Sequence, residues 1–157
     1  MSLADDVIGA LRTAGATVAT GESLTGGLVC ATLINVPGAS DVVLGGVVAY
    51  AAEAKIELLD VDVELIEDHG TVDADVAAQM AFGAQERFNA TYGLATTGVA
   101  GPGDSEGKPA GTVFIAIAGP DGVVTTALEL AGDRDTVRNG TVDALLSQLV
   151  GRLREET

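Results

Sequence analysis

Residues 17–34 read TVATGESLTGGLVCATLI, and this stretch decides the fold. Thr17 to Thr20 has the short, β-branched pattern of a buried strand, and residues 24–34 have the length and apolar spacing of a helix. Between them Gly21, Glu22 and Ser23 turn the chain, and two glycines let the first turn of the helix approach a backbone or a ligand. A strand that passes at once into a helix is the basic unit of an α/β sheet.

The same alternation continues on both sides of this unit. Further strands are predicted at 41–50, 92–97, 112–118 and 123–130, and further helices at 4–14, 53–59, 63–68, 73–88 and 133–154. The sequence GPDG at 119–122 is a strong turn signal and predicts that the last two strands form a hairpin. The pattern therefore predicts an α/β protein, a three-layer α/β/α sandwich with a mostly parallel mixed sheet of about five strands. We expect ligands beyond the strand ends, where the loops at 21–27, 37–40 and 98–111 would meet.

Composition limits the classes of protein to consider. A chain of 157 residues with 47% hydrophobic content can bury one sizeable core, which predicts one domain spanning 1–157. Because the formal charge is −15 and only 8 residues are Lys or Arg, we expect no nucleic-acid partner. No apolar run has the length of a membrane span and no signal peptide is evident, so we expect a cytoplasmic protein without a membrane partner. The dispersed acidic residues suggest adaptation to high salt as a hypothesis.

Ser40, Tyr50 and Lys55 form the constellation that could carry chemistry. A hydroxyl nucleophile, a phenol and an amine brought together could activate serine without histidine, provided that the pKa of the amine is lowered. Each residue alone has a simpler interpretation: Ser40 as a turn cap, Tyr50 as a ring at the edge of the core, and Lys55 as a surface lysine. Lys55 and Lys108 are the only lysines, and both neighbour motif-like loops.

Other polar positions have weaker signals. The segment ESLTGG at 22–27 could hold an anion on free backbone N–H groups, although Ser23 or Thr25 could equally be a simple helix cap. Arg134 and Arg138, four residues apart, could clamp a phosphate or carboxylate, or could pair with neighbouring aspartates. Cys30 is expected to be a core thiol and His69 a helix-end cap. Neither a phosphate-binding G-x-x-x-x-G-K-[ST] loop nor a cluster of metal ligands is present, and we expect no metal and no cofactor.

Short motifs in fixed order give the chain a resemblance to a known family. They are ESLTGG at 22–27, PGAS at 37–40, GVVAY at 46–50, EAK at 53–55, HG at 69–70, TGVAGP at 97–102, KPAGTV at 108–113 and GDR at 132–134. On these motifs, which run over nearly the whole chain, the sequence resembles the C-terminal domain of the competence/damage-inducible CinA proteins. Stand-alone members of that family are nicotinamide-nucleotide amidohydrolases.

The resemblance implies an amidohydrolase that acts on a linear amide. Its reaction would convert nicotinamide mononucleotide to nicotinate mononucleotide and ammonia, with Ser40 as the catalytic serine and Tyr50 and Lys55 as its activating partners. The substrate-binding positions that it implies are Ser23, Thr25, Gly26, Thr97, Gly98 and Arg134, with Arg138 as a further one.

Two rivals remain at this stage. One is a short-chain-dehydrogenase-like oxidoreductase, in which the lysine follows the tyrosine by four residues rather than five. The other is a non-catalytic nucleotide-binding or interaction module. A small alanine-rich domain with apolar helices could also form a symmetric homodimer.

Overall fold

A five-stranded mixed sheet forms the middle of the molecule, and the computed structural model describes residues 1–156 of the chain. The strand order is β2-β1-β3-β4-β5. Strands β1 (Val18–Glu22), β2 (Val43–Val48) and β3 (Tyr92–Gly98) run parallel, whereas β4 (Thr112–Gly119) and β5 (Gly122–Glu129) are antiparallel to their neighbours. The predicted α/β class, the mixed sheet of five strands and the closing hairpin are confirmed.

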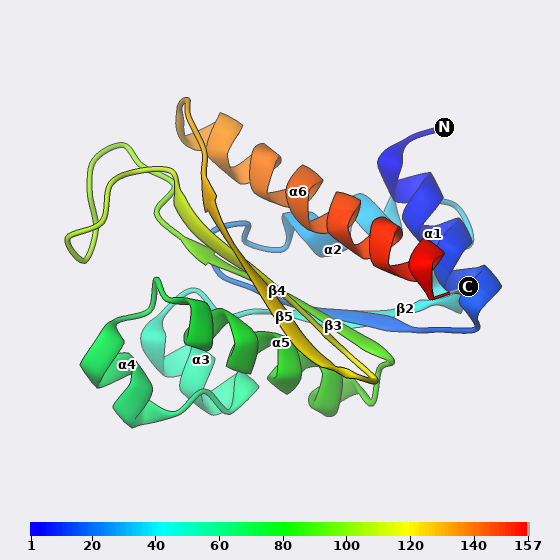
Figure 1. The fold of residues 1–157 in the computed structure, drawn as a ribbon, viewed down its shortest axis with the longest axis horizontal. Helices are drawn as coiled ribbons and strands as arrows, with labels where there is room; N and C mark the ends of the chain where they lie inside the picture. Colours follow the sequence, from blue (N-terminus) through cyan, green and yellow to red (C-terminus); the bar gives the residue numbers. More distant parts are fainter. Residues whose placement is uncertain (157) are drawn as a thin grey trace.

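Helices cover both faces of this sheet and complete the three layers (Figure 1). One face carries α1 (Leu3–Ala14), α2 (Leu28–Ile34) and α6 (Arg134–Glu155), and the other carries α3 (Ala52–Leu59), α4 (Val63–His69) and α5 (Ala74–Phe88). None of the helices described over residues 1–156 is long and apolar enough to cross a membrane.

Two apolar cores fill the spaces between sheet and helices. The larger lies under α1, α2 and α6, and the smaller under α3 and α5 is built largely from alanine and valine. The last helix turns an apolar face inward, and its buried residues include Val137, Val142, Leu145, Leu146, Leu149 and Leu153. Asp73 caps α5, because its carboxylate accepts the N–H groups of Asp75 and Val76.

Two element boundaries differ from the sequence prediction. The helix expected from residue 24 begins only at Leu28, because Gly26 and Gly27 have φ of 56° and 99°, which helical residues do not adopt. The strand expected over 41–50 shortens to β2, because Ala39–Asp41 forms a 3₁₀ turn and the chain leaves the ladder after Val48. These differences lie at the end of β1 and at the two ends of β2, and the candidate site follows the carboxyl ends of both strands.

The connections from β1 and β2 leave the sheet on opposite faces. The chain passes from β1 to α2 on one face, whereas from β2 it passes to α3 on the other (Figure 1). Ligands of open α/β sheets commonly bind at such a divergence, beyond the carboxyl ends of two adjacent parallel strands, and we call this region the crevice side of the sheet. The residues that follow β1 and β2 are therefore the first to consider for function.

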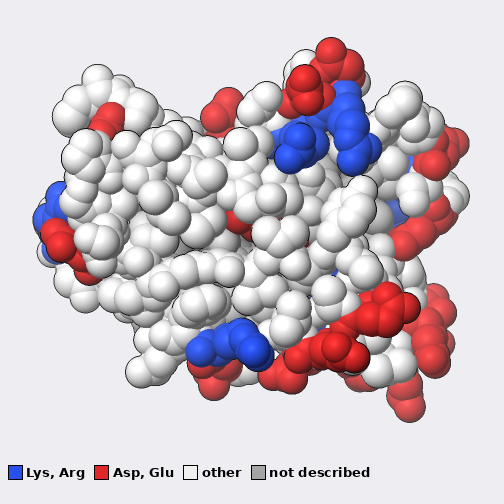
Figure 2. Space-filling model, turned by 180° about the vertical axis from the view of Figure 1, so that it is seen from behind, with Lys and Arg blue, Asp and Glu red and all other residues white. Residues whose placement is uncertain are grey.

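Charge is unevenly distributed over the surface. Figure 2 shows acidic side chains gathered along one side and the lower edge of the view, with basic side chains in a few small groups beside them. A broad area of the same face is uncharged. On this face the acidic side chains are thus gathered in part of the surface rather than spread evenly.

Candidate active site

Ser23 and Lys55 meet directly beyond the ends of β1 and β2. Lys55 Nζ donates a hydrogen bond of 2.9 Å to Ser23 Oγ, and two more of 2.9 and 3.0 Å to the carbonyls of Ala49 and Tyr50. The ladder brings these residues together: Glu22 pairs with Val48, and the N–H of Ala49 donates to the carbonyl of Glu22. A helical side chain leans toward the N-terminus of its helix, so Lys55 in the first turn of α3 points back at this junction.

The amine of Lys55 is deeply buried with neutral partners. The side chain is 1% exposed, and its three acceptors are a hydroxyl and two carbonyls rather than a carboxylate. Burial penalises the charged form and lowers the pKa of Lys55 to about 8, and the more distant Glu106 carboxylate raises it only in part. A substantial share of the amines is therefore neutral at slightly alkaline pH and can accept a proton from the serine.

Ser40 lies at the opposite end of β2 from Lys55. It sits exposed in the 3₁₀ turn before the strand, where Arg12 Nη2 donates to the carbonyl of Gly38 at 3.0 Å. Lys55 follows the strand, and six residues of β2 advance by about 20 Å. The predicted contact between Ser40 and Lys55 is therefore not made in the structure. The serine that Lys55 reaches is Ser23, which was predicted only as a substrate-binding position.

Tyr50 contributes its backbone rather than its phenol to the buried amine. Its carbonyl accepts from Lys55, whereas its side chain is 64% exposed and its hydroxyl accepts from Arg134 Nη2 at 3.4 Å. A second donor of the same guanidinium, Nη1, binds the carbonyl of Gly101 at 2.6 Å. The structure thus brings Tyr50 and Arg134 together at the rim of the site, and the predicted bond between the Tyr50 phenol and Lys55 is absent there.

Arg138 faces the backbone that follows Ser23. Its Nε donates to the carbonyl of Leu24 at 2.9 Å and its Nη2 to the carbonyl of Thr25 at 3.2 Å. The hydroxyl of Thr25 donates to Glu22 Oε1 at 2.7 Å, and a Cβ built on Gly26 would lie 3.6 Å from Arg138 Nη2. The side chains of Arg138 and Thr25 are thus engaged with the turn at residues 23–27, rather than open to a ligand.

The two predicted positions at the end of β3 also face protein. The buried hydroxyl of Thr97 donates to the carbonyl of Thr71 at 2.7 Å, which ties β3 to the segment before α5. Gly98 allows a close strand approach, since a Cβ there would lie 2.7 Å from the carbonyl oxygen of Thr112. Neither side chain presents a free polar group to the crevice.

Glu106 anchors the long loop at 98–111, in which Gly98 was the only predicted functional position. Its carboxylate accepts the N–H and hydroxyl of Thr71 and the N–H of Val72. Burial raises the pKa of Glu106, but the bonds from Thr71 and Val72 outweigh it and leave the pKa below its usual value. These bonds tie the loop to the segment that precedes α5, and they favour the ionised carboxylate of Glu106.

Glu22 is a second residue to which the sequence reading gave no role. It is 1% exposed, and its carboxylate accepts from two hydroxyls and two backbone N–H groups around Ser23. A glutamate at the end of an otherwise apolar strand was the available signal, because a buried charge needs a reason. Over residues 1–156, no group of three or more His, Cys, Asp or Glu side chains is placed to hold a metal ion.

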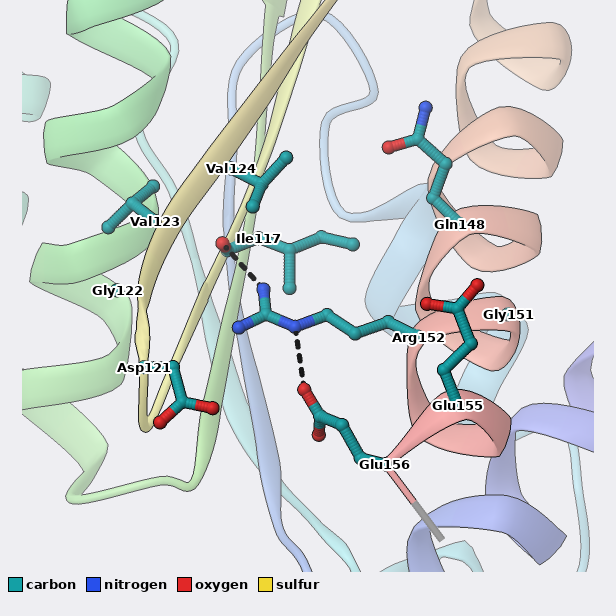
Figure 3. A pocket seen from close by; sticks show the side chains of 10 residues that line it. All are labelled: Ile117, Asp121, Gly122, Val123, Val124, Gln148, Gly151, Arg152, Glu155 and Glu156. Carbon is teal, nitrogen blue, oxygen red and sulfur yellow. Dashed lines mark hydrogen bonds and ion pairs between the residues drawn. The ribbon is translucent and has the colours of Figure 1, made fainter.

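A sizeable hollow lies away from this constellation. Its volume is about 570 Å³, and it is bounded by the β4–β5 turn and the end of α6 (Figure 3). That turn pairs with the start of β3, whereas Ser23 follows the end of β1, so the hollow and Ser23 lie at opposite edges of the sheet. Arg152 Nε, which lines the hollow, donates to Glu156 Oε1 at 3.1 Å and leaves no free cation there (Figure 3). We therefore place the candidate active site at the Ser23–Lys55 crevice.

Comparison with known proteins agrees with the fold and the motifs. The model of the CinA C-terminal domain matches residues 1–153. A CinA-like protein of Frankia casuarinae is 49% identical over 152 residues, which cover 97% of this chain but only 35% of that relative. The chain therefore spans about a third of the length of this curated relative.

Solved structures of the same superfamily match the whole fold. A CinA superfamily protein of Klebsiella pneumoniae superposes with a TM-score of 0.95 at 30% identity, covering 98% of this chain and 96% of that one. The competence/damage inducible protein CihA of Agrobacterium tumefaciens superposes with a TM-score of 0.92 at 37% identity, covering 97% and 93%. The sheet order and the layers described above are thus shared with experimentally determined structures.

Proposed function

Since the chain belongs to the CinA C-terminal domain family, we propose that it is an amidohydrolase that converts nicotinamide mononucleotide to nicotinate mononucleotide and ammonia. The observation that carries the proposal is the bond of 2.9 Å between Lys55 Nζ and Ser23 Oγ in a buried setting. A serine bonded to an amine whose pKa is about 8 is a nucleophile next to its base. We assign the nucleophile to Ser23, in place of the Ser40 that the resemblance implied.

The chemistry follows from this pair. Neutral Lys55 takes the hydroxyl proton as Ser23 Oγ attacks the carboxamide carbon, and then gives that proton to the leaving nitrogen, which departs as ammonia. The acyl ester on Ser23 is attacked by water, whose proton passes to Lys55 while the acid is released and the serine hydroxyl is restored. The net reaction consumes one water per amide, and neither a metal nor a redox partner is required.

Arg134 supports recognition of the nucleotide phosphate. It is an exposed cation at the rim of the site in a protein of net charge −15, and its Nη2 donates only one long bond, of 3.4 Å, to the Tyr50 hydroxyl. A guanidinium with a free edge binds phosphate through paired donors. We therefore propose that Arg134, with Tyr50 beside it, distinguishes the nucleotide from nicotinamide riboside, which lacks the phosphate.

Ammonia release by the purified protein tests the proposal. We expect release from nicotinamide mononucleotide, loss of at least about 1000-fold in kcat with Ser23→Ala, and little change with Ser40→Ala. Arg134→Ala should raise KM for the nucleotide and leave KM for the riboside unchanged. Loss of activity in Ser40→Ala but not in Ser23→Ala would return the nucleophile to Ser40. Nucleotide binding without any ammonia release would favour a non-catalytic binding module.

A further inference from the structure

We infer that Glu22 and Arg138 are positioning residues that hold the turn at residues 23–27 from its two sides and so aim Ser23 and one backbone N–H at the substrate. The inference rests on the proposed function, because it takes Ser23 as the nucleophile. It assigns to Arg138 a task different from the phosphate or carboxylate clamp that the sequence suggested. Neither residue touches the reacting atoms in this arrangement.

The carboxylate of Glu22 is fully used by the turn and the helix that follows it. Oε1 accepts from Thr25 Oγ1 at 2.7 Å and from the N–H of Val29 at 2.8 Å. Oε2 accepts from Thr20 Oγ1 at 3.1 Å and from the N–H of Cys30 at 3.0 Å. All four partners donate to Glu22, so both carboxylate oxygens serve here as acceptors.

Glu22 is costly to bury because none of these partners carries a positive charge. The four donors are hydroxyls and amides rather than a lysine or arginine, and the residue is 1% exposed. A helix start can be satisfied more cheaply by an exposed aspartate, as Asp73 does for α5. The gain from Glu22 is geometric, since it fixes both the hydroxyl of Thr25 and the first N–H groups of α2 next to Ser23.

Arg138 fixes the opposite side of the same turn through its carbonyls. Its two bonds hold the carbonyls of Leu24 and Thr25 toward α6. In a trans peptide the N–H points away from the carbonyl of the preceding residue, so the N–H of Thr25 faces away from Arg138. The N–H of Gly26 already donates to the carbonyl of Ser23, whereas the N–H of Thr25 has no acceptor in the part of the chain that the structure describes. The N–H groups of Leu24 and Gly27 also lack an acceptor among the described residues, but only Thr25 N–H shares a peptide with the Leu24 carbonyl that Arg138 Nε binds. Thr25 N–H is thus the donor that Arg138 would aim at an oxyanion.

Two matched controls separate positioning from stability. Asp73→Asn removes a carboxylate that also accepts helix N–H groups, but at α5. Arg12→Met removes a guanidinium that also binds a backbone carbonyl, but at Gly38 beside the 3₁₀ turn. The test variants are Glu22→Gln, which places an amide N–H₂ against donors, and Arg138→Met, which keeps the length of the side chain and loses both bonds.

Each variant is assayed in two reactions below its unfolding temperature. One is ammonia release from nicotinamide mononucleotide, and the other is the burst of p-nitrophenol from p-nitrophenyl acetate, which reports acylation of Ser23 without nucleotide recognition. We expect Glu22→Gln and Arg138→Met to lower kcat and the burst rate by about 10- to 100-fold, with KM and the midpoint of the pH–rate profile unchanged. Both controls should stay within about twofold of the native protein.

Every outcome decides the inference. Burst rates equal to those of the native protein in both test variants would overturn it and leave the proposed function standing. A rise in KM alone for Arg138→Met would make Arg138 a substrate contact instead.

A native burst without ammonia release would refute the proposed function, while the ratio of burst rates still tests the positioning roles. A native protein with neither Ser23-dependent ammonia release nor a Ser23-dependent burst would overturn both. If Glu22→Gln does not fold, Thr25→Val removes one donor to Glu22 at similar volume and should give a smaller fall in burst rate.

Discussion

Lys55 shows how one side chain can be costly to the fold and useful to the site. Its ammonium gains three hydrogen bonds, but the carboxylate of Glu106 offsets only part of the cost of its burial, and the fold therefore favours the neutral amine. The same hydrogen bonds fix the nitrogen on Ser23 Oγ, so the group that loses its proton is already in place to receive the proton of the serine. Two measurements at this scale follow from the lowered pKa.

The rate should follow the ionisation of Lys55. Below a pKa of about 8 the amine is protonated and cannot act as a base, so kcat/KM for the nucleotide should rise about tenfold per pH unit and level off above pH 8. Initial rates between pH 5 and 9.5 at constant ionic strength check this. A profile that is flat from pH 5 to 9 would rule out Lys55 as the base.

The free energy of unfolding should depend on pH through the same group, Lys55. Unfolded Lys55 keeps its proton up to about 10.5 and folded Lys55 up to about 8, so the unfolded state binds more protons between these values. The free energy of unfolding of the native protein should therefore rise, relative to Lys55→Met, by on the order of 1–3 kcal/mol from pH 8 to pH 10.5. Urea unfolding at several pH values measures the difference, with Lys108→Met as the control that shows no such trend. A constant difference for Lys55→Met would contradict the lowered pKa.

At the scale of elements, glycines let the backbones of neighbouring helices and strands pack in direct contact. A Cβ on Gly83 in α5 would lie 2.0 Å from the carbonyl oxygen of Leu59 at the end of α3, so the two helices touch through backbone. A Cβ on Gly93 in β3 would similarly lie 2.0 Å from the carbonyl oxygen of Ala81. These contacts set how near α3, which carries Lys55, packs to the sheet that carries Ser23.

Two helical glycines should therefore respond in opposite directions to alanine. Gly151→Ala in α6 meets no atom within 4 Å and should raise the free energy of unfolding by about 0.5–1 kcal/mol through helix propensity. Gly83→Ala gains the same propensity but pushes α5 off Leu59, and should lower the free energy of unfolding by about 1–3 kcal/mol. Urea unfolding of both variants measures the pair. Equal effects would mean that α3 and α5 separate at little cost.

The sequence predicted the elements well and the pairing of residues in the site poorly. Strand and helix types follow from local periodicity, and the hairpin turn at 119–122 follows from local turn chemistry. Which serine meets Lys55 depends on sheet order and direction, because β1 and β2 run parallel and place Ser23 and Lys55 at the same edge. Ser40 and Lys55 are close in sequence, yet β2 separates them. The role of Glu22 likewise depends on donors that converge only after folding.

At the scale of the whole molecule, charge and fold oppose each other. Formal charges sum to −15, and the acidic side chains crowd one side of the molecule in Figure 2. The three ion pairs between arginine and carboxylate side chains among the described residues, such as Arg12–Asp41 at 3.4 Å, are mostly exposed and offset little of this repulsion. Self-repulsion of this size destabilises a compact state and is relieved by salt.

Potassium chloride should accordingly stabilise the protein. We expect the urea midpoint of unfolding to rise between 0.05 and 1 M KCl and to change less beyond, because the Debye length has fallen to about 3 Å by 1 M. Urea is the denaturant of choice because it adds no ions. A midpoint that is the same at low and molar salt would remove the hypothesis of adaptation to a saline interior.

Both ends of the described chain lie far from the crevice. The two termini are on the same side of the molecule in Figure 1, where Met1 lies in one hollow with Leu153 and Arg154, and the end of α6 reaches the β4–β5 turn at the edge of the sheet opposite Ser23. A tether or a fused module attached at either end would thus leave the mouth of the site open. The domain is built so that it can be immobilised on a support, or carried as one unit of a larger polypeptide, with its chemistry facing outward.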